Sequence, residues 1–427
     1  MDPERLAAYP FIPAPTPPLM IVGGQGSHLH TADGRRILDG GGGAIVANIG
    51  HGRPEPAEAA AAALTDAAYA IPLWATEHRL RLVERLQQHW LPAELTRCLF
   101  VSGGSESIET AIRVARQHHA ARGELDRWKV VGRSISYHGA TLGALSVANH
   151  DRRRAGLEPL LLDVPKADFF DAEQVRKMVE AEDPSTIAAI VVEPVSGASG
   201  GALRPPDDYL PALRSICDDH GILLIADEVM TGFGRTGANF GVDHQGIVPD
   251  LLVGGKGLGG GYVPMGAVFA TDAVVAPLAD TGATVMYYTF SGSDVCCAVS
   301  ARVLQIMDDE QLVAQAAHRG RQLAELLHQR FDDHPHVADV RGQGLLQGLQ
   351  LTADRASGTG YGGNLAPLVV AEALARDCWV YPAGSGVIED ALLFGPPFTV
   401  SESELEQLVE ITAAAIDAAV GRIASAA

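Results

Sequence analysis

Lys256 carries the clearest chemical signal in this sequence. The chain of 427 residues has only four lysines, and the other three, Lys129, Lys166 and Lys177, lie among polar or charged neighbours. Lys256 instead follows the apolar run 251–253 and is flanked by glycines, which let a backbone approach a ligand closely. Because burial lowers the pKa of an amine and makes it nucleophilic, the pattern predicts a reactive lysine.

A phosphate-binding P-loop is the competing interpretation of this glycine-rich segment. That motif needs Gly six residues before the lysine and Ser or Thr directly after it. This sequence has Asp250 and Gly257 at those positions. The register therefore excludes a P-loop.

Asp227 is the second candidate, because it ends an apolar run at 222–226 and is followed by Glu228. Adjacent residues of a strand point to opposite faces, so only one of the two carboxylates can face a given site. Open α/β sheets bind their ligands at the carboxyl ends of parallel strands. We expect Asp227 to face the site, since the glycine-rich stretch that follows does not read as a helix that Asp would cap.

Two weaker signals complete the set. The segment 102–106, Ser-Gly-Gly-Ser-Glu, precedes a helical pattern, so the backbone of Gly104 and Ser105 could bind a phosphate or simply cap the helix. Tyr137 could stack on a flat ring or belong to the core. Together with Lys256 and Asp227 these features describe pyridoxal 5′-phosphate (PLP): the lysine forms an imine, the aspartate keeps the pyridine nitrogen protonated, and the helix start holds the phosphate.

Two other chemistries can be weighed. The string 197–201, Gly-Ala-Ser-Gly-Gly, matches the G-x-S-x-G pattern of serine hydrolases, with Ser199 as nucleophile. That elbow must lead directly into a helix, whereas Pro205 and Pro206 follow here, so a serine hydrolase is a remote alternative. The histidines form no pair at i, i+4 with a carboxylate, and we predict no metal site.

The elements that must position these groups alternate along the chain. Short apolar runs at 97–101, 130–131, 187–192, 222–226 and 251–253 are separated by helical patterns, which is typical of an α/β fold with a mainly parallel sheet. Further helices precede a strand pair near 340–350, and an amphipathic helix begins at Glu402. We predict an N-terminal arm and part of a small domain over 1–54, a large cofactor-binding domain over 55–300, and a C-terminal α+β small domain over 301–427.

Near the N-terminus, the prolines of segment 9–18 favour an extended arm, and Asp33-Gly34 predicts a β-hairpin over 28–39.

The net charge of −20 disfavours nucleic acid and anionic membranes as partners. Without an apolar run long enough to span a bilayer, or a leader-like start, we expect a cytoplasmic protein. The five cysteines form no framework and are expected to be reduced core thiols.

At this point the sequence resembles the class III aminotransferases, which are PLP enzymes of fold type I, also called the aspartate aminotransferase superfold. The resemblance rests on segments 224–237, 249–256 and 264–267, with shorter matches at 49–52, 193–194, 289–292, 340–345 and 395–397. It implies that Lys256 is the Schiff-base lysine and Asp227 the partner of the pyridine nitrogen. Val229 and Tyr137 would enclose the ring, and Gly104 and Ser105 would bind phosphate. It also implies a homodimer in which Thr289 reaches the neighbouring subunit's phosphate.

The resemblance further implies an aminotransferase that acts by ping-pong half-reactions on an amine donor and a carbonyl acceptor. A PLP-dependent aminomutase, epimerase or decarboxylating transaminase stays open, because these enzymes share the same lysine and aspartate. Many family members bind the substrate carboxylate through an Arg before the Pro-Pro pair, but segment 379–396 contains none.

This absence bears on the substrate. Approximate alignment gives apolar or aromatic pocket walls, Ile45, Trp74, Tyr137 and Tyr288, and so favours a bulky or distal amine of omega-aminotransferase type or from biosynthesis. A keto acid would still need an arginine, for which the candidates are Arg53, Arg79 and Arg341.

Overall fold

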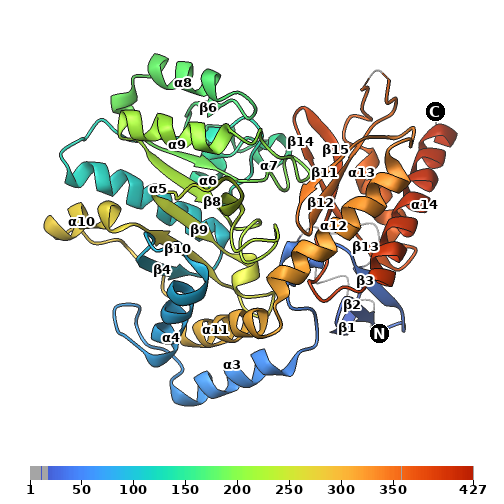
Figure 1. The fold of residues 1–427 in the computed structure, drawn as a ribbon, viewed down its shortest axis with the longest axis horizontal. Coiled ribbons are helices and arrows are strands. Elements are labelled where there is room, and N and C mark those ends of the chain that lie inside the picture. The colour runs from blue at the N-terminus through green and yellow to red at the C-terminus, as the bar shows by residue number, and fades with distance from the viewer. Residues whose placement is uncertain (1–10, 12–17, 357, 427) are drawn as a thin grey trace.

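A mixed sheet of seven strands forms the centre of the computed structural model, which describes residues 11, 18–356 and 358–426 (Figure 1). The strand order is β4-β10-β9-β8-β7-β5-β6, and all neighbours are parallel except β10, which runs antiparallel to both β4 and β9. The predicted mainly parallel sheet is thus confirmed. The strands are β4 (Arg97–Val101), β5 (Lys129–Arg133), β6 (Lys166–Ala167), β7 (Ile187–Val192), β8 (Leu223–Asp227), β9 (Leu251–Gly254) and β10 (Gly266–Ala270).

Helices cover both faces of this sheet because its central strands are apolar on both sides. All six residues of β7 are buried. Side chains of one face pack with helix α5, and those of the other face pack with α9. The helices of this part are α5 (Gly104–Ala121), α6 (Leu142–Val147), α7 (Asp151–Arg154), α8 (Ala172–Ala181), α9 (Tyr209–His220) and α10 (Asp272–Asp280).

Two smaller sheets lie beside the large one (Figure 1). In the first, the predicted hairpin joins β2 (His28–Thr31) to β3 (Arg36–Asp39), flanked by β1 (Ile21–Gln25) and by β13 (Cys378–Trp379), so strands from the two ends of the chain pair. The second, antiparallel sheet has the order β11-β12-β15-β14. Its strands are β11 (Val337–Gln343), β12 (Leu346–Leu351), β14 (Tyr381–Ser385) and β15 (Ile388–Phe394).

The remaining helices connect and cover these sheets. Helices α3, α4 and α11 pack together below the large sheet in Figure 1, whereas α12, α13 and α14 pack beside the small sheets. Their bounds are α2 (Gly42–Ile45), α3 (Pro54–Asp66), α4 (Glu77–Arg85, continued by a π-helical turn over Leu86–Trp90), α11 (Asp294–Asp309), α12 (Leu312–Phe331), α13 (Leu365–Leu374) and α14 (Glu402–Ala426).

Other sequence-based expectations can be compared with this structure. All five cysteines are free thiols, four buried and Cys98 partly buried. No helix in the described part of the chain is long and apolar enough to cross a membrane. The proline-rich segment 9–18 lies almost entirely outside the described residues. The domain boundaries at 54/55 and 300/301, and the cytoplasmic location, stay predictions.

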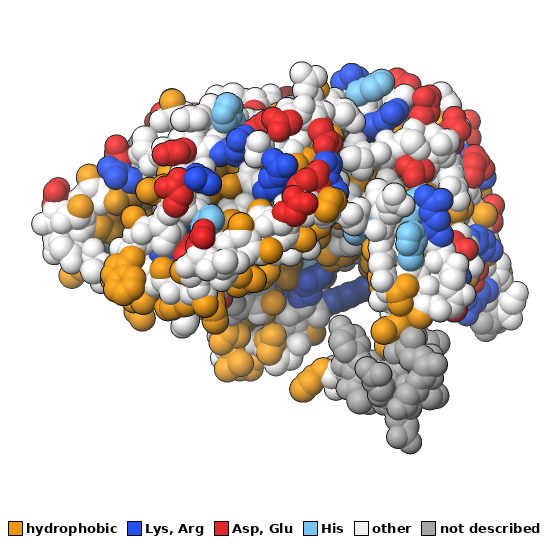
Figure 2. Space-filling view, turned by 90° about the horizontal axis from the view of Figure 1, so that it is seen from below, with side chains coloured by type: hydrophobic (Ala, Val, Ile, Leu, Met, Phe, Trp, Pro, Cys, Tyr) orange, Lys and Arg blue, Asp and Glu red, His pale blue; other side chains and the backbone are white. Residues whose placement is uncertain are grey.

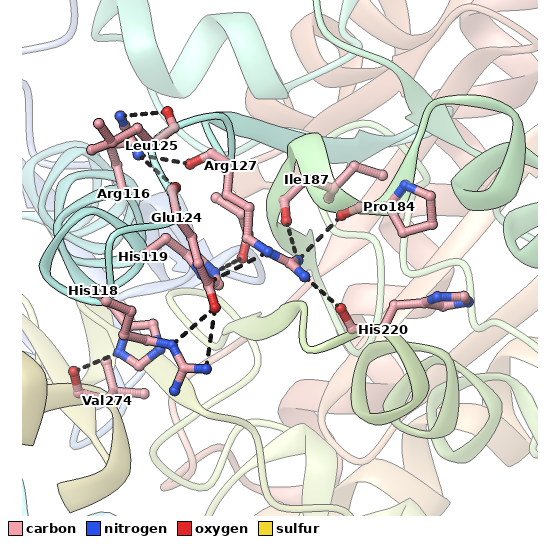
Figure 3. Close-up of polar contacts among 12 residues, drawn as sticks. Arg116, His118, His119, Glu124, Leu125, Arg127, Pro184, Ile187, His220 and Val274 are labelled. Atoms are coloured by element: carbon pink, nitrogen blue, oxygen red, sulfur yellow. Dashed lines mark hydrogen bonds and ion pairs between the residues drawn. The ribbon is translucent and has the colours of Figure 1, made fainter.

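A network of polar side chains fastens the edge of the large sheet where the parallel strands begin (Figure 3). His119, near the end of α5, contacts the Glu124 carboxylate through Nδ1 at 2.6 Å and the carbonyl of Ala188 through Nε2 at 3.0 Å. The Arg127 guanidinium donates to three backbone carbonyls. We call His119, Arg122, Glu124 and Arg127 the His119 cluster. Since α5 spans the sheet, its first turn lies at the opposite edge, where the strands end.

Candidate active site

A cavity of about 200 Å³ opens at the carboxyl edge of the large sheet. It is formed where β8 and β9 end, at the first turn of α5, and along the loop that follows β5. Six residues singled out in the sequence line it together: Gly104, Ser105, Tyr137, Asp227, Val229 and Lys256. These residues are up to 152 positions apart in the sequence, counting from Gly104 to Lys256, and the parallel strand order brings them to one place.

Lys256 begins a short 3-10 turn, separated from the end of β9 only by Gly255, and has a positive φ of 39°. The glycines on either side of Lys256 pack closely against neighbouring residues and so fix its position. A Cβ atom added to Gly257 would lie 2.4 Å from Nδ2 of Asn48, and one added to Gly255 would lie 3.2 Å from Cγ1 of Val229. Burial lowers the pKa of Lys256 to about 8, against the opposing effect of Asp227. The neutral, nucleophilic form of this amine is therefore easier to reach near neutral pH than that of an ordinary lysine.

Asp227 is held at the end of β8 by two contacts. One carboxylate oxygen lies 2.7 Å from Nδ1 of His138, and the other accepts a hydrogen bond of 3.0 Å from the backbone N–H of Val229. Asp227 is only 4% exposed, so these two contacts fix the orientation of its carboxylate inside the protein. Glu228 points to the other face, where it accepts hydrogen bonds from the backbone of Gly241 and Val242.

The first turn of α5 closes one end of the cavity. Among the described residues, no side chain caps this helix, whose N-cap residue is Gly103. The Ser105 hydroxyl accepts a hydrogen bond of 3.0 Å from the N–H of Ala140, which leaves its own proton free to donate. A Cβ added to Gly104 would lie 2.7 Å from Cγ1 of Val229, so a glycine is needed here. Uncapped N–H groups and a hydroxyl are the donors that suit a phosphate.

Tyr137, Val229 and Glu193 all line the same cavity. The Glu193 carboxylate accepts hydrogen bonds from the backbone N–H groups of Tyr137 (3.1 Å) and Gly197 (3.2 Å), and so fixes the loop that carries Tyr137. Burial is the main cause that raises the pKa of Glu193, and it outweighs the opposing effect of His138. The set of groups fits PLP: an amine, a fixed carboxylate, phosphate donors and two walls.

The residues predicted to contact substrate are divided between two places. Ile45 is buried and packs with Val195 and Met230, which line the cavity. Trp74 and Thr289 are exposed and, like Tyr288, do not line the cavity of their own chain. The roles proposed for these three residues therefore stay predictions.

The three arginines considered for carboxylate binding already donate to acceptors of the same chain, so their role toward a substrate stays a prediction. Arg53 pairs with Glu55 and Glu310. Arg79 donates to four backbone carbonyls, and Arg341 to those of Gly200 and Gly201. None of the three lines the cavity. Sequence alone cannot show which acceptors the fold brings to a long side chain.

Ser199 gives no support to a hydrolase. Its hydroxyl is fully buried and has no hydrogen-bond partner in the described part of the chain, so no histidine activates it. The segment 197–201 forms turns rather than a strand that leads into a helix. The geometry of a nucleophile elbow is therefore missing.

Seven further lining residues were not selected from the sequence: His138, Gly139, Glu193, Val195, Ala198, Met230 and Thr231. His138 is the most informative of them, because it fixes Asp227 while its Nε2 atom has no partner among the described residues. Its position beside Tyr137 was the only signal available. A histidine next to a proposed stacking residue becomes meaningful only when the strand order shows that it faces Asp227.

The known proteins that are similar to this chain are aminotransferases, which agrees with the groups found in the cavity. The family model for class-III aminotransferases matches residues 12–416. An omega-aminotransferase of Caulobacter vibrioides is 33% identical over 92% of both chains, and an acetylornithine aminotransferase of Mycolicibacterium smegmatis is 35% identical over 95% of both. A thermostable (S)-enantioselective omega-transaminase from Thermomicrobium roseum superposes with a TM-score of 0.91 at 34% identity, covering 97% of this chain and 98% of that one.

The fold and the cavity thus define a transaminase of PLP fold type I. The chain belongs to the class-III aminotransferases, as its resemblance to that family indicated, and it is an enzyme of the PLP-dependent transaminase type.

Proposed function

We propose that this enzyme transfers an amino group from an amine or amino acid donor to a keto acid, aldehyde or ketone in two ping-pong half-reactions, with Lys256 as the covalent attachment point of PLP. The observation that carries the proposal is the position of Lys256, whose pKa is lowered to about 8, in one cavity with the fixed carboxylate of Asp227. The other three lysines do not line this cavity.

Each group of the cavity has a distinct task in this proposal. When bound, PLP supplies an electron sink that stabilises negative charge at the carbon bearing the amino group. Asp227, oriented by His138, would keep the pyridine nitrogen protonated, and the first turn of α5 with Ser105 would hold the phosphate. Tyr137 and Val229 would enclose the ring. After the donor displaces it, Lys256 would take the proton from that carbon and return it at a neighbouring position.

The donor side of the proposal follows from the apolar wall of the cavity. Val195, Ala198 and Met230 line the cavity, and Val195 and Met230 belong to the same apolar cluster as Ile45. These side chains offer no charge to a donor. A buried pocket of this kind binds an uncharged chain or ring without leaving a polar group unpaired. We therefore propose a bulky or distal amine as donor, of the omega type or from a biosynthetic route.

We also propose a homodimer, on the evidence of an exposed apolar face. Leu73, Trp74, Met286 and Phe290 are each at least 62% exposed. Tyr69 joins the two segments, because its ring contacts Phe290 edge to face and its hydroxyl donates to the carbonyl of Thr289. Hydrophobic side chains gather along one margin of the molecule in Figure 2, whereas charged side chains cover the face above it. Such a patch favours association, which would bring Thr289 and Trp74 to the neighbouring subunit's cavity.

Borohydride trapping with peptide mapping tests the central assignment. Reduction of the enzyme loaded with PLP should fix the cofactor on Lys256, and Lys256→Ala should lose both the label and turnover, by on the order of 10⁶-fold. Lys166 is the matched internal control, because burial also lowers its pKa to about 8 although it lies outside the cavity. Label on Lys166, Lys129 or Lys177 would exclude Lys256 as the attachment point.

A panel of amine donors and carbonyl acceptors then separates transamination from the related reactions. Transamination requires that the donor emerge as a ketone or aldehyde and that the acceptor emerge as an amine. An aminomutase or epimerase would return the amino group to the same molecule, and a decarboxylating enzyme would release CO₂. Preference for an α-amino acid on both sides of the reaction would contradict the proposed distal-amine pocket.

A further inference from the structure

A buried asparagine lies directly against the turn that carries Lys256. Asn48 is only 1% exposed, and its Nδ2 atom donates a hydrogen bond of 2.9 Å to the carbonyl of Phe233. The same atom would lie 2.4 Å from a Cβ added to Gly257, so a glycine leaves room for the amide beside the turn. Asn48 therefore contacts both the residue after Lys256 and the loop that follows β8.

Both of these segments hold a residue other than glycine in the left-handed region of the backbone. The φ angle is 39° at Lys256 and 54° at Phe233. A side chain with a Cβ atom keeps such an angle only where its surroundings hold it, and such residues are common at functional sites. The Asn48 amide lies between the two segments and holds each against the other.

Arg235 fixes the other end of the same amide. Its Nη2 atom donates a hydrogen bond of 2.9 Å to Oδ1 of Asn48, and its Nη1 atom donates to the carbonyls of Pro396 (2.7 Å) and Leu345 (3.3 Å). Leu345 connects β11 to β12, and Pro396 follows the end of β15. The planar guanidinium holds these acceptors in one geometry. This buried arginine thus joins the Lys256 turn, through Asn48, to the small antiparallel sheet.

We propose that Asn48 and Arg235 are positioning residues for Lys256: the Asn48 amide holds the turn that carries the lysine, and Arg235 fixes this amide to the small antiparallel sheet. The inference rests on the proposed function, because it concerns the lysine assigned there to PLP. Neither residue lines the cavity, so both act through the backbone of the turn rather than on a ligand. A displaced turn would move the Lys256 amine away from the carbon whose proton it takes.

Asn48→Ser tests the first contact in the complete enzyme loaded with PLP. The shorter side chain cannot reach the Phe233 carbonyl and the Lys256 turn together, so kcat should fall about 10- to 100-fold while the KM of the amine donor stays within about twofold. Asn239→Ser is the matched control, because the Asn239 amide also donates to backbone carbonyls, those of His89 and Trp90 rather than that of Phe233. The control should keep the wild-type kcat per folded enzyme.

A double-mutant cycle tests the same contact from the side of the turn. Gly257→Ala adds a Cβ that would lie 2.4 Å from the Asn48 amide, so this variant alone should also lower kcat. Asn48→Ser removes the atom that the new Cβ would meet. The double variant should therefore lose less than the product of the two single losses, by about threefold or more. Losses that simply multiply would show that the Asn48 amide does not act on the turn.

A third measurement uses the enzyme without PLP and does not depend on turnover. Acetylation by acetic anhydride at increasing pH, followed by peptide mapping, gives the titration midpoint of Lys256, with Lys166 of the same sample as reference. Burial lowers the pKa of both lysines to about 8. Release of the turn in Asn48→Ser should raise the Lys256 midpoint by about one pH unit and leave that of Lys166 unchanged. The charged groups that act on the Lys256 amine are all kept in this variant: Asp227, Glu193, Arg153 and Arg235.

Arg235→Lys keeps the buried charge but loses the planar donors that reach Asn48 and the two carbonyls together. It should produce the same changes in kcat and in the Lys256 midpoint, and it decides the role of the pair if Asn48→Ser does not fold. An unchanged kcat and an unchanged Lys256 midpoint in the folded variants, whatever their melting temperatures, would overturn this inference alone. Absence of amino transfer by the wild-type enzyme would instead overturn the proposed function, and the Lys256 midpoint would still decide the role of Asn48.

Discussion

Two buried histidine–carboxylate pairs lie at opposite edges of the same sheet, and they differ in how completely they are satisfied. At the amino edge, both ring nitrogens of His119 face acceptors, Glu124 and the carbonyl of Ala188. At the carboxyl edge, His138 contacts Asp227 through Nδ1, while its buried Nε2 has no partner in the described part of the chain. The first pair fastens loops, whereas the second orients a carboxylate toward a cavity.

The contrast shows how one fold separates stability from chemistry. Helix α5 joins the two edges, with its last turns in the His119 cluster and its uncapped first turn at the cavity. A cluster whose donors and acceptors are all used resists change, because each lost partner leaves a buried group unpaired. A site must instead keep donors and acceptors available for a ligand. Variants of the two pairs should therefore affect different measured quantities.

Asp227→Asn should have the largest effect. The substitution keeps the shape and removes the charge that would hold the pyridine nitrogen protonated, so proton removal from the donor should slow by about 10²- to 10⁴-fold. The cofactor should still bind, and the melting temperature should stay near that of the wild type. Single-turnover absorbance measurements with excess amine report the rate. A half-reaction near the wild-type rate would mean that another group serves the ring nitrogen.

His138 should come next, and two variants distinguish its contacts. His138→Asn keeps a donor near the position of Nδ1 and should retain most of the half-reaction rate. His138→Phe removes the donor and should slow the reaction about 10- to 100-fold, the range typical of residues that orient a functional group. Equal rates in the two variants would show that the contact with Asp227 does not matter. The Phe variant should also shift the pH profile of the half-reaction, which a purely structural change would leave in place.

The sequence could predict those features of the fold and the site that leave a local pattern, but not those that depend on the order of the strands. Apolar runs such as 187–192 show buried strands directly, and glycines around Lys256 show a close backbone approach, so the sheet and the central residues were predictable. His138 carries no periodic signal, and its importance depends on the strand order that brings it against Asp227. The antiparallel β10 was also hidden, because a short apolar run does not reveal its direction.

His119→Ala should affect stability rather than catalysis. Removal of the ring takes one partner from the Ala188 carbonyl and one from the Glu124 carboxylate, at a place where His119 is only 1% exposed. The cost should be roughly 1–3 kcal/mol, seen as a melting temperature lowered by a few degrees. Turnover per folded enzyme should not change. The exposed His318→Ala is the control, and an equal loss of stability there would show that His119 has no special role.

Glu124→Gln should have the smallest effect, and the effect should depend on pH. His119 and Arg122 lower the pKa of Glu124 below its ordinary value of 4.5, even though burial acts in the opposite direction. A carboxylate with a lowered pKa in the folded state stabilises the protein above its unfolded pKa, and this stabilisation disappears as the pH falls through the folded pKa. Because the Glu124 side chain is 32% exposed, the contribution should stay below about 1 kcal/mol. The variant should therefore melt slightly below the wild type at pH 7, and the two melting temperatures should converge as the pH falls below 4.5. A difference that stays constant across this range would mean that the Glu124 charge contributes nothing and that only its shape matters at this edge of the sheet.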